Sequence, residues 1–224
     1  PFTTAANEIY DSGDFERVID TVIEKADWKN FETRRAEAKP LGRKRGIGLC
    51  YYIESTMGDP GEAAEIRFEE DGTVCVLVGT QSNGQGHETA YAQVASDRLG
   101  LPIEKIRIVQ GDTDLIATGG GTGGSRSLTA QATAIDAAAD LVIERGKHYA
   151  AQGLEAAVAD IEFDEGTFKI AGTDRHIAIL DLARQARKMD APSEEIDGGL
   201  DARGAITLPA WTFPNGCHVA EVEI

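Results

Sequence analysis

Cysteine is scarce in this chain of 224 residues, and its scarcity disfavours a disulfide-stapled domain and a cysteine-bound metal site. The three cysteines, Cys50, Cys75 and Cys217, are odd in number and lie far apart in the sequence. A disulfide-stapled secreted domain needs paired cysteines, and a structural metal site needs ligands at short, regular spacings. The sequence therefore predicts three unpaired thiols, no metal bound by them, and a reducing, cytoplasmic setting.

Long apolar runs are absent as well, and basic residues are fewer than acidic ones. No stretch approaches the roughly 20 apolar residues that a membrane-spanning helix needs. Lysine and arginine number 22 against 38 aspartates and glutamates, which gives a net charge of -16. A field of that sign repels polyanions, so the composition argues against nucleic acid or an anionic membrane as a partner. Any anionic ligand must be held by local groups.

Glycine is plentiful instead, at 25 residues, and two glycine-rich loops each lie between a strand pattern and a helix pattern. The first glycine loop, residues 83–88, reads Asn83-Gly84-Gln85-Gly86-His87-Glu88 and follows the apolar run 74–78. The second glycine loop, residues 119–127, reads GGGTGGSRS and follows the alternating run 106–109. Such a unit directs backbone N–H groups and the positive end of a helix dipole toward an anion. Two units predict one extended, multiply charged ligand.

The other patterns complete an α+β fold, in which mixed sheet layers pack against amphipathic helices around the two strand, glycine loop and helix units. Helical spacing predicts helices from an N-cap at Asp14 to about residue 38, from 88 to 99, from a serine cap near 125–127 to 146, and from 179 to 189. Strand patterns cover 47–57, 64–68, 74–78 and 161–170, with a hairpin turn at residues 71–72. Because residues 218–224 alternate like a strand up to the last residue, we expect the chain to be a piece of a longer polypeptide.

Several kinds of site fit these loops poorly. Neither loop has the phosphate-binding pattern G-x-x-x-x-G-K-[ST] or the full dinucleotide pattern G-x-G-x-x-G. His87 and Glu88 begin the zinc motif H-E-x-x-H, but Tyr91 replaces the second histidine, which disfavours a zinc hydrolase. Gln85 is either an amide that reaches a ligand or an ordinary surface glutamine. Arg126 is either a residue that binds a phosphate or a solvated surface arginine. Glu62 falls in a predicted turn with no charge partner, and we assign it no catalytic role.

Four segments of the chain together resemble one enzyme family. Residues 79–93, centred on the first glycine loop, and residues 122–127 resemble the two cofactor loops in the large subunit of the molybdenum hydroxylases. These are the family of xanthine dehydrogenase, aldehyde oxidase and aerobic carbon monoxide dehydrogenase. Residues 1–16 and 214–224 resemble the same family, so the likeness covers nearly the whole chain. It is stronger to the bacterial carbon monoxide dehydrogenase-like branch than to the animal xanthine oxidases.

The resemblance implies a molybdopterin-binding part of such a large subunit, with a helical lead-in at 1–40 and a cofactor-binding domain at 41–224. It implies that the Gln85 amide lies near a molybdenum oxo ligand, and that the chain holds neither a catalytic residue nor a protein ligand to the metal. The cofactor, with molybdenum, is expected in its cytosine dinucleotide form in the parent enzyme and is expected to be absent from the isolated chain. The residues implied to bind it are Asn83, Gly84, Gln85, Gly86, His87, Thr122, Gly123, Gly124, Ser125, Arg126 and Ser127.

The comparison also has departures and gaps. Asn83 stands where many relatives have glutamine, and Gly123 where some have tyrosine, so only backbone contacts carry over at these two positions. The base glutamate and the substrate-facing loop of the family lie outside residues 1–224. The resemblance implies that the parent protein oxidises a small molecule with water-derived oxygen and passes electrons to iron-sulfur and FAD subunits or domains, whereas the chain alone is inactive. A stand-alone phosphate- or nucleotide-binding module and a structural or interaction domain remain as alternatives.

Overall fold

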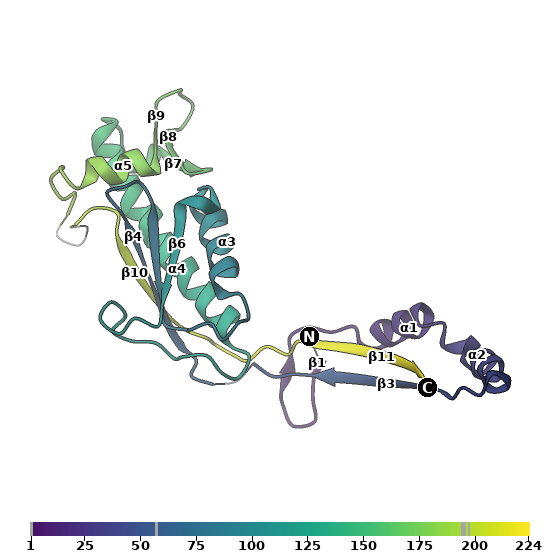
Figure 1. Ribbon diagram of the computed structural model, residues 1–224. Helices are drawn as coiled ribbons and strands as arrows, with labels where there is room; N and C mark the ends of the chain where they lie inside the picture. Colours follow the sequence, from purple (N-terminus) through teal and green to yellow (C-terminus); the bar gives the residue numbers. More distant parts are fainter. Residues whose placement is uncertain (1, 57, 194–195, 197) are drawn as a thin grey trace. The chain divides into compact units, whose positions relative to one another are not determined.

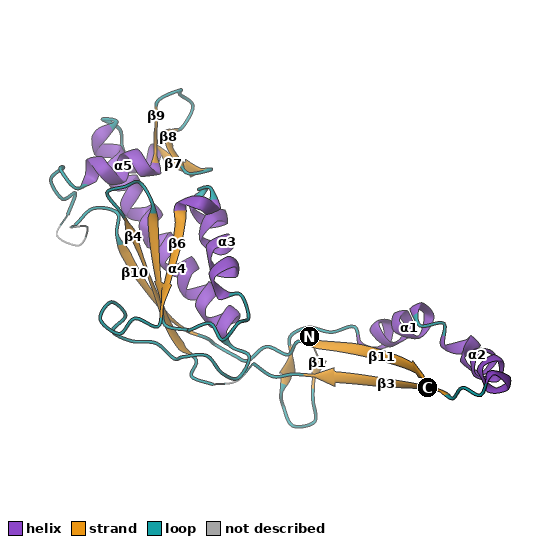
Figure 2. Ribbon diagram, viewed as in Figure 1, coloured by secondary structure: helices purple, strands orange, loops and turns teal. Residues whose placement is uncertain are grey.

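Helices and strands follow one another without a regular repeat along the chain (Figure 1). The computed structural model describes residues 2–56, 58–193, 196 and 198–224, and within them it has five α-helices and eleven strands. Figure 2 shows how the two kinds of element are mixed, and the predicted α+β class is confirmed. The chain divides into two compact units, Pro1–Thr56 with Ala210–Ile224, and Met57–Pro209. The predicted division into a lead-in at 1–40 and a cofactor-binding domain at 41–224 concerns which residues bind the cofactor. The compact units have other boundaries and do not test it, so it stays a prediction.

The first unit begins with a short ribbon of β1 (Phe2–Thr3) and β2 (Ile9–Tyr10), followed by two helices. Asp14 caps α1 (Phe15–Lys25), accepting a hydrogen bond from Arg17 N at 3.3 Å as predicted. The single helix predicted to residue 38 is wrong. Asp27 has a φ of 48°, and the chain then makes a 3-10 turn (Trp28–Asn30) before α2 (Phe31–Ala38) and a further turn (Lys39–Leu41). A left-handed residue ends a right-handed helix, and apolar spacing carries no signal for it.

A long antiparallel ribbon completes the first unit. It joins β3 (Arg45–Ile53) to β11 (Asn215–Glu223), with Ile53 opposite Asn215. Glu221 on β11 lies 2.7 Å from Arg34 of α2 and 3.1 Å from Arg45 of β3. The hydrogen bond from Arg34, aided by the charges of both arginines, lowers the pKa of Glu221. Ionic contacts thus join the helical segment to the ribbon.

The second unit is built on a four-stranded sheet in the order β10-β4-β5-β6. The strands are β4 (Gly61–Phe68), β5 (Val74–Val78), β6 (Ile106–Gln110) and β10 (Ala202–Thr207). β5 and β6 are parallel and the other pairs are antiparallel, with the predicted turn at residues 71–72 between β4 and β5. Helices α3 (His87–Leu99) and α4 (Ser127–Gly153) contact each other and cover one face of the sheet (Figure 1).

Small residues allow α4 to pack closely on that face. A side chain at Gly204 on β10 would meet the α4 backbone, with Ala137 C at 2.7 Å. The alanines of α4 that face the sheet, Ala134 and Ala138 among them, are fully buried. The core between α4 and the sheet is therefore made of short side chains over a nearby backbone.

The rest of the second unit packs at one end of α4. A three-stranded sheet of β7 (Ile161–Asp164), β8 (Thr167–Ile170) and β9 (His176–Ala178) leads into α5 (Ile179–Ala186). Two further 3-10 turns lie at Ile103–Lys105 and Val158–Asp160. The predicted end of α4 at Gly146 is wrong, because the helix continues to Gly153. Gly146 is buried, and a Cβ there would lie 2.7 Å from Phe168 Cε1, so this glycine makes room for the ring and does not end the helix.

The three cysteines are unpaired, as predicted. Cys75 is buried in β5, and burial raises the pKa of its thiol, whereas Cys50 is exposed on β3. Within the described residues, every helix is too short or too polar to cross a bilayer. The predicted cytoplasmic setting stays a prediction.

Candidate functional site

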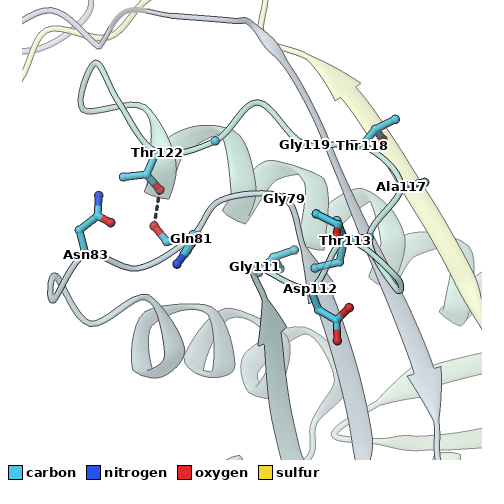
Figure 3. Close-up of a pocket in the computed structure, with 13 residues that line it drawn as sticks. Gly79, Gln81, Asn83, Gly111, Asp112, Thr113, Ala117, Thr118, Gly119 and Thr122 are labelled. Carbon is cyan, nitrogen blue, oxygen red and sulfur yellow. Dashed lines mark hydrogen bonds between the residues drawn. The ribbon is translucent and has the colours of Figure 1, made fainter.

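The two glycine loops lie at one end of the central sheet, where the parallel strands β5 and β6 finish. A pocket of about 460 Å³ opens there (Figure 3). Its lining comes from three segments: residues 78–83 after β5, residues 111–118 after β6, and residues 119–122 of the second glycine loop. The carboxyl ends of parallel strands are the usual place for a ligand in a sheet of this kind. Residues of both glycine loops therefore border one pocket, and their role in ligand binding stays a prediction.

The first glycine loop is shaped by two residues in the left-handed region, Gly84 with a φ of 102° and Gly86 with a φ of 79°. Only glycine adopts such values without strain, so the loop turns sharply into the first turn of α3. Gln85 folds back on the loop, and its Oε1 accepts a hydrogen bond from Asn83 N at 2.5 Å. Gln110, at the end of β6, accepts a hydrogen bond from Ser82 N at 2.9 Å. The loop is thus attached to the neighbouring parallel strand.

The threonine of the second glycine loop holds that loop to Gln81, just before the first glycine loop. Thr122 Oγ1 donates a hydrogen bond of 2.5 Å to Gln81 O, which Figure 3 shows as a dashed line, and accepts one of 3.3 Å from Ser127 Oγ. The predicted serine cap of α4 is wrong, because the N-cap position is Arg126 and no side chain caps it. Ser125 has a φ of 57°, which directs the chain into the helix from an unusual angle. The first N–H groups of α4 therefore have no partner within the helix.

The backbone between β5 and the first glycine loop touches the start of the second glycine loop. A Cβ at Gly79 would lie 2.5 Å from Gly119 Cα, and a Cβ at Gly119 would lie 2.5 Å from Gly79 Cα. No side chain fits between them at that distance. Glycine at both positions is therefore what allows the two loops to form one surface.

A network of buried polar side chains stabilises the backbone around Gly79. Gln131 of α4 is fully buried; its Oε1 accepts from Gly79 N at 3.1 Å and its Nε2 donates to Ala63 O at 2.9 Å. Tyr91 of α3 forms a 2.6 Å hydrogen bond with Thr80 and donates one of 3.3 Å to the carbonyl of Ser127. Burial raises the pKa of Tyr91, which keeps the phenol protonated as a donor. The starts of α3 and α4 are thereby joined.

The positions and partners of Glu62 and Arg126 differ most from those predicted from the sequence. Glu62 is not in a turn without a charge partner: it lies on β4, and its buried carboxylate is 3.2 Å from Arg126 Nη1. Sequence reasoning missed this pair because the partners are far apart in the chain. The predicted contact of Arg126 with a phosphate stays a prediction, and the guanidinium bonds here to Glu62 and to the carbonyls of Gly61 and Gly121.

His87, the first residue of α3, is a further buried polar side chain of the site. It is 5% exposed and its ring lies 4.8 Å from that of Tyr91. Its Nδ1 is buried and has no hydrogen-bond partner in the structure. A buried polar atom without a hydrogen-bond partner destabilises the fold, and a polar ligand group at this helix start would supply the missing partner. Among the described residues, no group of three or more His, Cys, Asp or Glu is placed to hold a metal ion.

The predicted residues divide into two groups. Asn83 and Thr122 line the pocket, while the others follow in the same two loops and in the first residues of α3 and α4. Sequence reasoning missed the third side of the pocket, residues 111–118, which follows β6 and includes Asp112 and Thr113 (Figure 3). The signal was available, because Gly111 comes two residues after the predicted strand at 106–109.

This arrangement defines a class of protein: a domain in which two glycine loops, each leading into a helix, meet at one end of a mixed sheet. The chain belongs to the molybdopterin cofactor-binding domain family, whose model matches residues 21–224. The resemblance found in the sequence is thereby confirmed.

The chain is similar to parts of several enzyme subunits. The chain is 31% identical to the carbon monoxide dehydrogenase large chain of Hydrogenophaga pseudoflava, which it matches over 100% of its own length and 30% of that protein. It is also 31% identical to the 6-hydroxypseudooxynicotine dehydrogenase complex subunit gamma of Paenarthrobacter nicotinovorans, over 96% of this chain and 27% of the relative.

Solved structures give the same result. Quinoline 2-oxidoreductase from Pseudomonas putida 86 matches with a TM-score of 0.87 and 31% identity, over 100% of this chain and 30% of that one. A Cu,Mo-CO dehydrogenase matches with a TM-score of 0.85 and 28% identity over the same shares. The chain thus spans about 30% of the length of these relatives.

Proposed function

We propose that this chain, as part of its parent protein, binds a molybdenum-containing molybdopterin cofactor between its two glycine loops. The observation that carries the proposal is the backbone contact at Gly79 and Gly119, which joins two helix-starting loops into one surface. The groups present suit an anionic, phosphate-bearing ligand, because two helix starts offer unpaired N–H groups and left-handed glycines leave the backbone uncovered. The unpaired Nδ1 of His87 adds a polar atom in need of a partner.

Each loop has its own part in this proposal. Residues 83–87 hold the pterin end, with the Gln85 amide toward the metal, and residues 122–127 hold the phosphate and nucleotide end. Held in this way, the cofactor supplies the redox chemistry. The chain supplies binding and orientation through its backbone amides and hydroxyl groups. The cytosine dinucleotide form is part of the proposal, as is the assignment of cofactor binding to residues 41–224.

We propose further that the parent protein is a molybdenum hydroxylase. It would oxidise a small molecule with oxygen derived from water and pass the electrons to iron-sulfur and FAD subunits or domains. What supports this is the likeness to a carbon monoxide dehydrogenase large chain and to a subunit of a dehydrogenase complex. Because the chain spans about 30% of those proteins, we expect it to be inactive by itself.

A matched pair of valine substitutions in the complete protein tests the cofactor proposal. Gly86 and Gly172 have similar φ values, 79° and 73°, and a Cβ would meet no atom within 4 Å at either one. Gly86→Val and Gly172→Val therefore impose the same backbone strain, but only the first places a side chain over the first glycine loop. We expect molybdenum per polypeptide to fall at least about tenfold in Gly86→Val and to stay at the wild-type level in Gly172→Val.

The measurement is molybdenum by elemental analysis of each purified protein, with circular dichroism to compare their folds. Equal molybdenum contents in the two variants would remove the first glycine loop from the site. A wild-type protein that contains no molybdenum when produced with molybdate would refute the proposed function as a whole.

A further inference from the structure

The ion pair between Glu62 and Arg126 is the most deeply buried charged pair in the described part of the chain. The side chains are 0% and 3% exposed, and the closest atoms, Glu62 Oε2 and Arg126 Nη1, are 3.2 Å apart. Glu62 belongs to β4, in the middle of the sheet order, whereas Arg126 is the last residue before α4. The pair therefore connects the rigid sheet to the end of the second glycine loop.

Both partners also bind the backbone of that loop. Glu62 Oε2 accepts a hydrogen bond of 3.2 Å from Gly120 N, and Arg126 Nη1 donates one of 3.1 Å to Gly121 O. An amide and a carbonyl of two consecutive residues are thus fixed by opposite charges. Fixing both groups restricts the φ and ψ angles between them, in a segment of glycines that would otherwise have wide freedom.

The surroundings leave little room for another arrangement. A Cβ at Gly120 would lie 2.5 Å from Arg126 Nη1, so the loop backbone packs directly on the guanidinium. Arg126 Nη2 donates to Gly61 O at 2.8 Å, and Nε is buried without a partner. Every nitrogen of the guanidinium is therefore either bonded inside the protein or shielded, and the charge is balanced by Glu62.

Stability alone is a weak reason for such a pair. Removing two charges from water is costly, and a buried pair replaced by apolar side chains of similar volume often leaves a protein equally stable or more stable. A pair that binds loop backbone on both sides has another effect, which is to select one loop conformation. This is the kind of preorganisation that reduces the entropy lost when a ligand binds.

We propose that Glu62 and Arg126 are positioning residues, which hold the second glycine loop in its cofactor-binding shape before the cofactor arrives. The proposal rests on the proposed function of the two loops. It assigns the attraction for the anionic cofactor to the backbone N–H groups and hydroxyls of residues 122–127, and Arg126 holds this segment in place of the direct phosphate contact expected from the sequence. Neither residue takes part in the chemistry.

A double variant and a matched double control test this proposal in the complete protein. Glu62→Leu with Arg126→Met removes both charges at once and leaves no buried charge without a partner. Glu65→Leu with Arg67→Met is the control, because that pair, 2.6 Å apart, also lies on β4 and has no hydrogen bond to the loop in the structure. Hydrogen exchange by mass spectrometry is measured on protein produced without molybdate, and molybdenum content on protein produced with it.

We expect the amides of residues 118–124 to exchange at least about tenfold faster in the Glu62/Arg126 double variant than in wild type, while β4, β5 and β6 keep their wild-type rates. Molybdenum content should fall in that variant and stay unchanged in the control. Arg126→Lys, which keeps the charge but loses the forked contact, should give intermediate exchange, and it serves as the test if the double variant does not fold.

Two outcomes overturn the proposal. Exchange at 118–124 equal to wild type would mean that the pair does not order the loop, and acceleration spread evenly over β4, β5 and β6 would make it an ordinary core pair. The exchange measurement needs no cofactor, so its result does not depend on whether the proposed function holds. If wild-type protein produced with molybdate lacks molybdenum, the proposed function and the role of this loop shape in cofactor binding fail together. If wild type holds molybdenum while loop exchange is unaltered in the variant, only the role of the pair fails.

Discussion

Replacing Gly119 by alanine should separate the two glycine loops. The added Cβ would lie 2.5 Å from Gly79 Cα, 2.6 Å from Gly79 O and 2.9 Å from Gly79 C, whereas real Cβ contacts essentially never fall below 3.0 Å. All three neighbours are backbone atoms, so no side-chain rotation can relieve the clash. The two backbones must move apart by about half an ångström or more, and overpacking of this kind costs about 1–3 kcal/mol.

The matched control is Gly123→Ala in the same loop. A Cβ at Gly123 would meet no atom within 4 Å, and its φ is not in the left-handed region. We expect Gly119→Ala to lower the unfolding temperature of this domain by about 2–4 °C for each kcal/mol lost, and to reduce molybdenum content because the loops no longer form one surface. Gly123→Ala should leave the unfolding temperature unchanged.

Scanning calorimetry and molybdenum analysis of the complete protein provide the measurements. If Gly119→Ala matched Gly123→Ala in both, the close approach of Gly79 and Gly119 would have no energetic importance. The observation that carries the proposed function would then lose its support.

Three further predictions concern stability. Gln131→Leu should cost about 2–5 kcal/mol in denaturant unfolding, because it leaves a buried N–H and a buried carbonyl without partners, whereas the exposed Gln152→Leu on the same helix should change stability by less than about 0.5 kcal/mol. Gly146→Ala should lower the unfolding temperature although alanine favours a helix by about 1 kcal/mol, and Phe168→Leu in the same chain should restore part of the loss. Glu221 has a lowered pKa in the folded chain, so its stabilising effect is present above the usual carboxyl pKa of 4.5 and disappears as the pH falls through the lowered value. Thermal unfolding recorded from about pH 7 down to about pH 3 should show that loss, and Glu221→Gln should reduce it; an identical pH dependence would contradict the assignment.

Local signals explain which parts of the fold could be predicted. Both strand, glycine loop and helix units were found, because an apolar run, a cluster of glycines and a helical spacing are each readable within a few residues. The α+β class and the hairpin turn at 71–72 follow from the same kind of signal. Most of the predicted element positions hold for this reason.

The errors come from contacts between distant parts of the chain. Gly146 looks like a helix end in sequence, and only the ring of Phe168 explains it. Glu62 looks unpaired because Arg126 comes next to it only when α4 packs on β4. The helix breaks at Asp27 because this one residue is in the left-handed conformation, which the spacing of apolar residues does not reveal. Sequence patterns thus located the two glycine loops but not the buried groups that shape them.

The pairing of β3 with β11 has a consequence for the order of folding during synthesis. The second unit, residues 57–209, is continuous in the chain, and all its strands have been synthesised once β10 has been made. The first unit is discontinuous, because β3 meets its partner β11 only after that whole intervening stretch. The glycine loops can therefore be assembled while β3 is still an unpaired edge that needs protection from other chains.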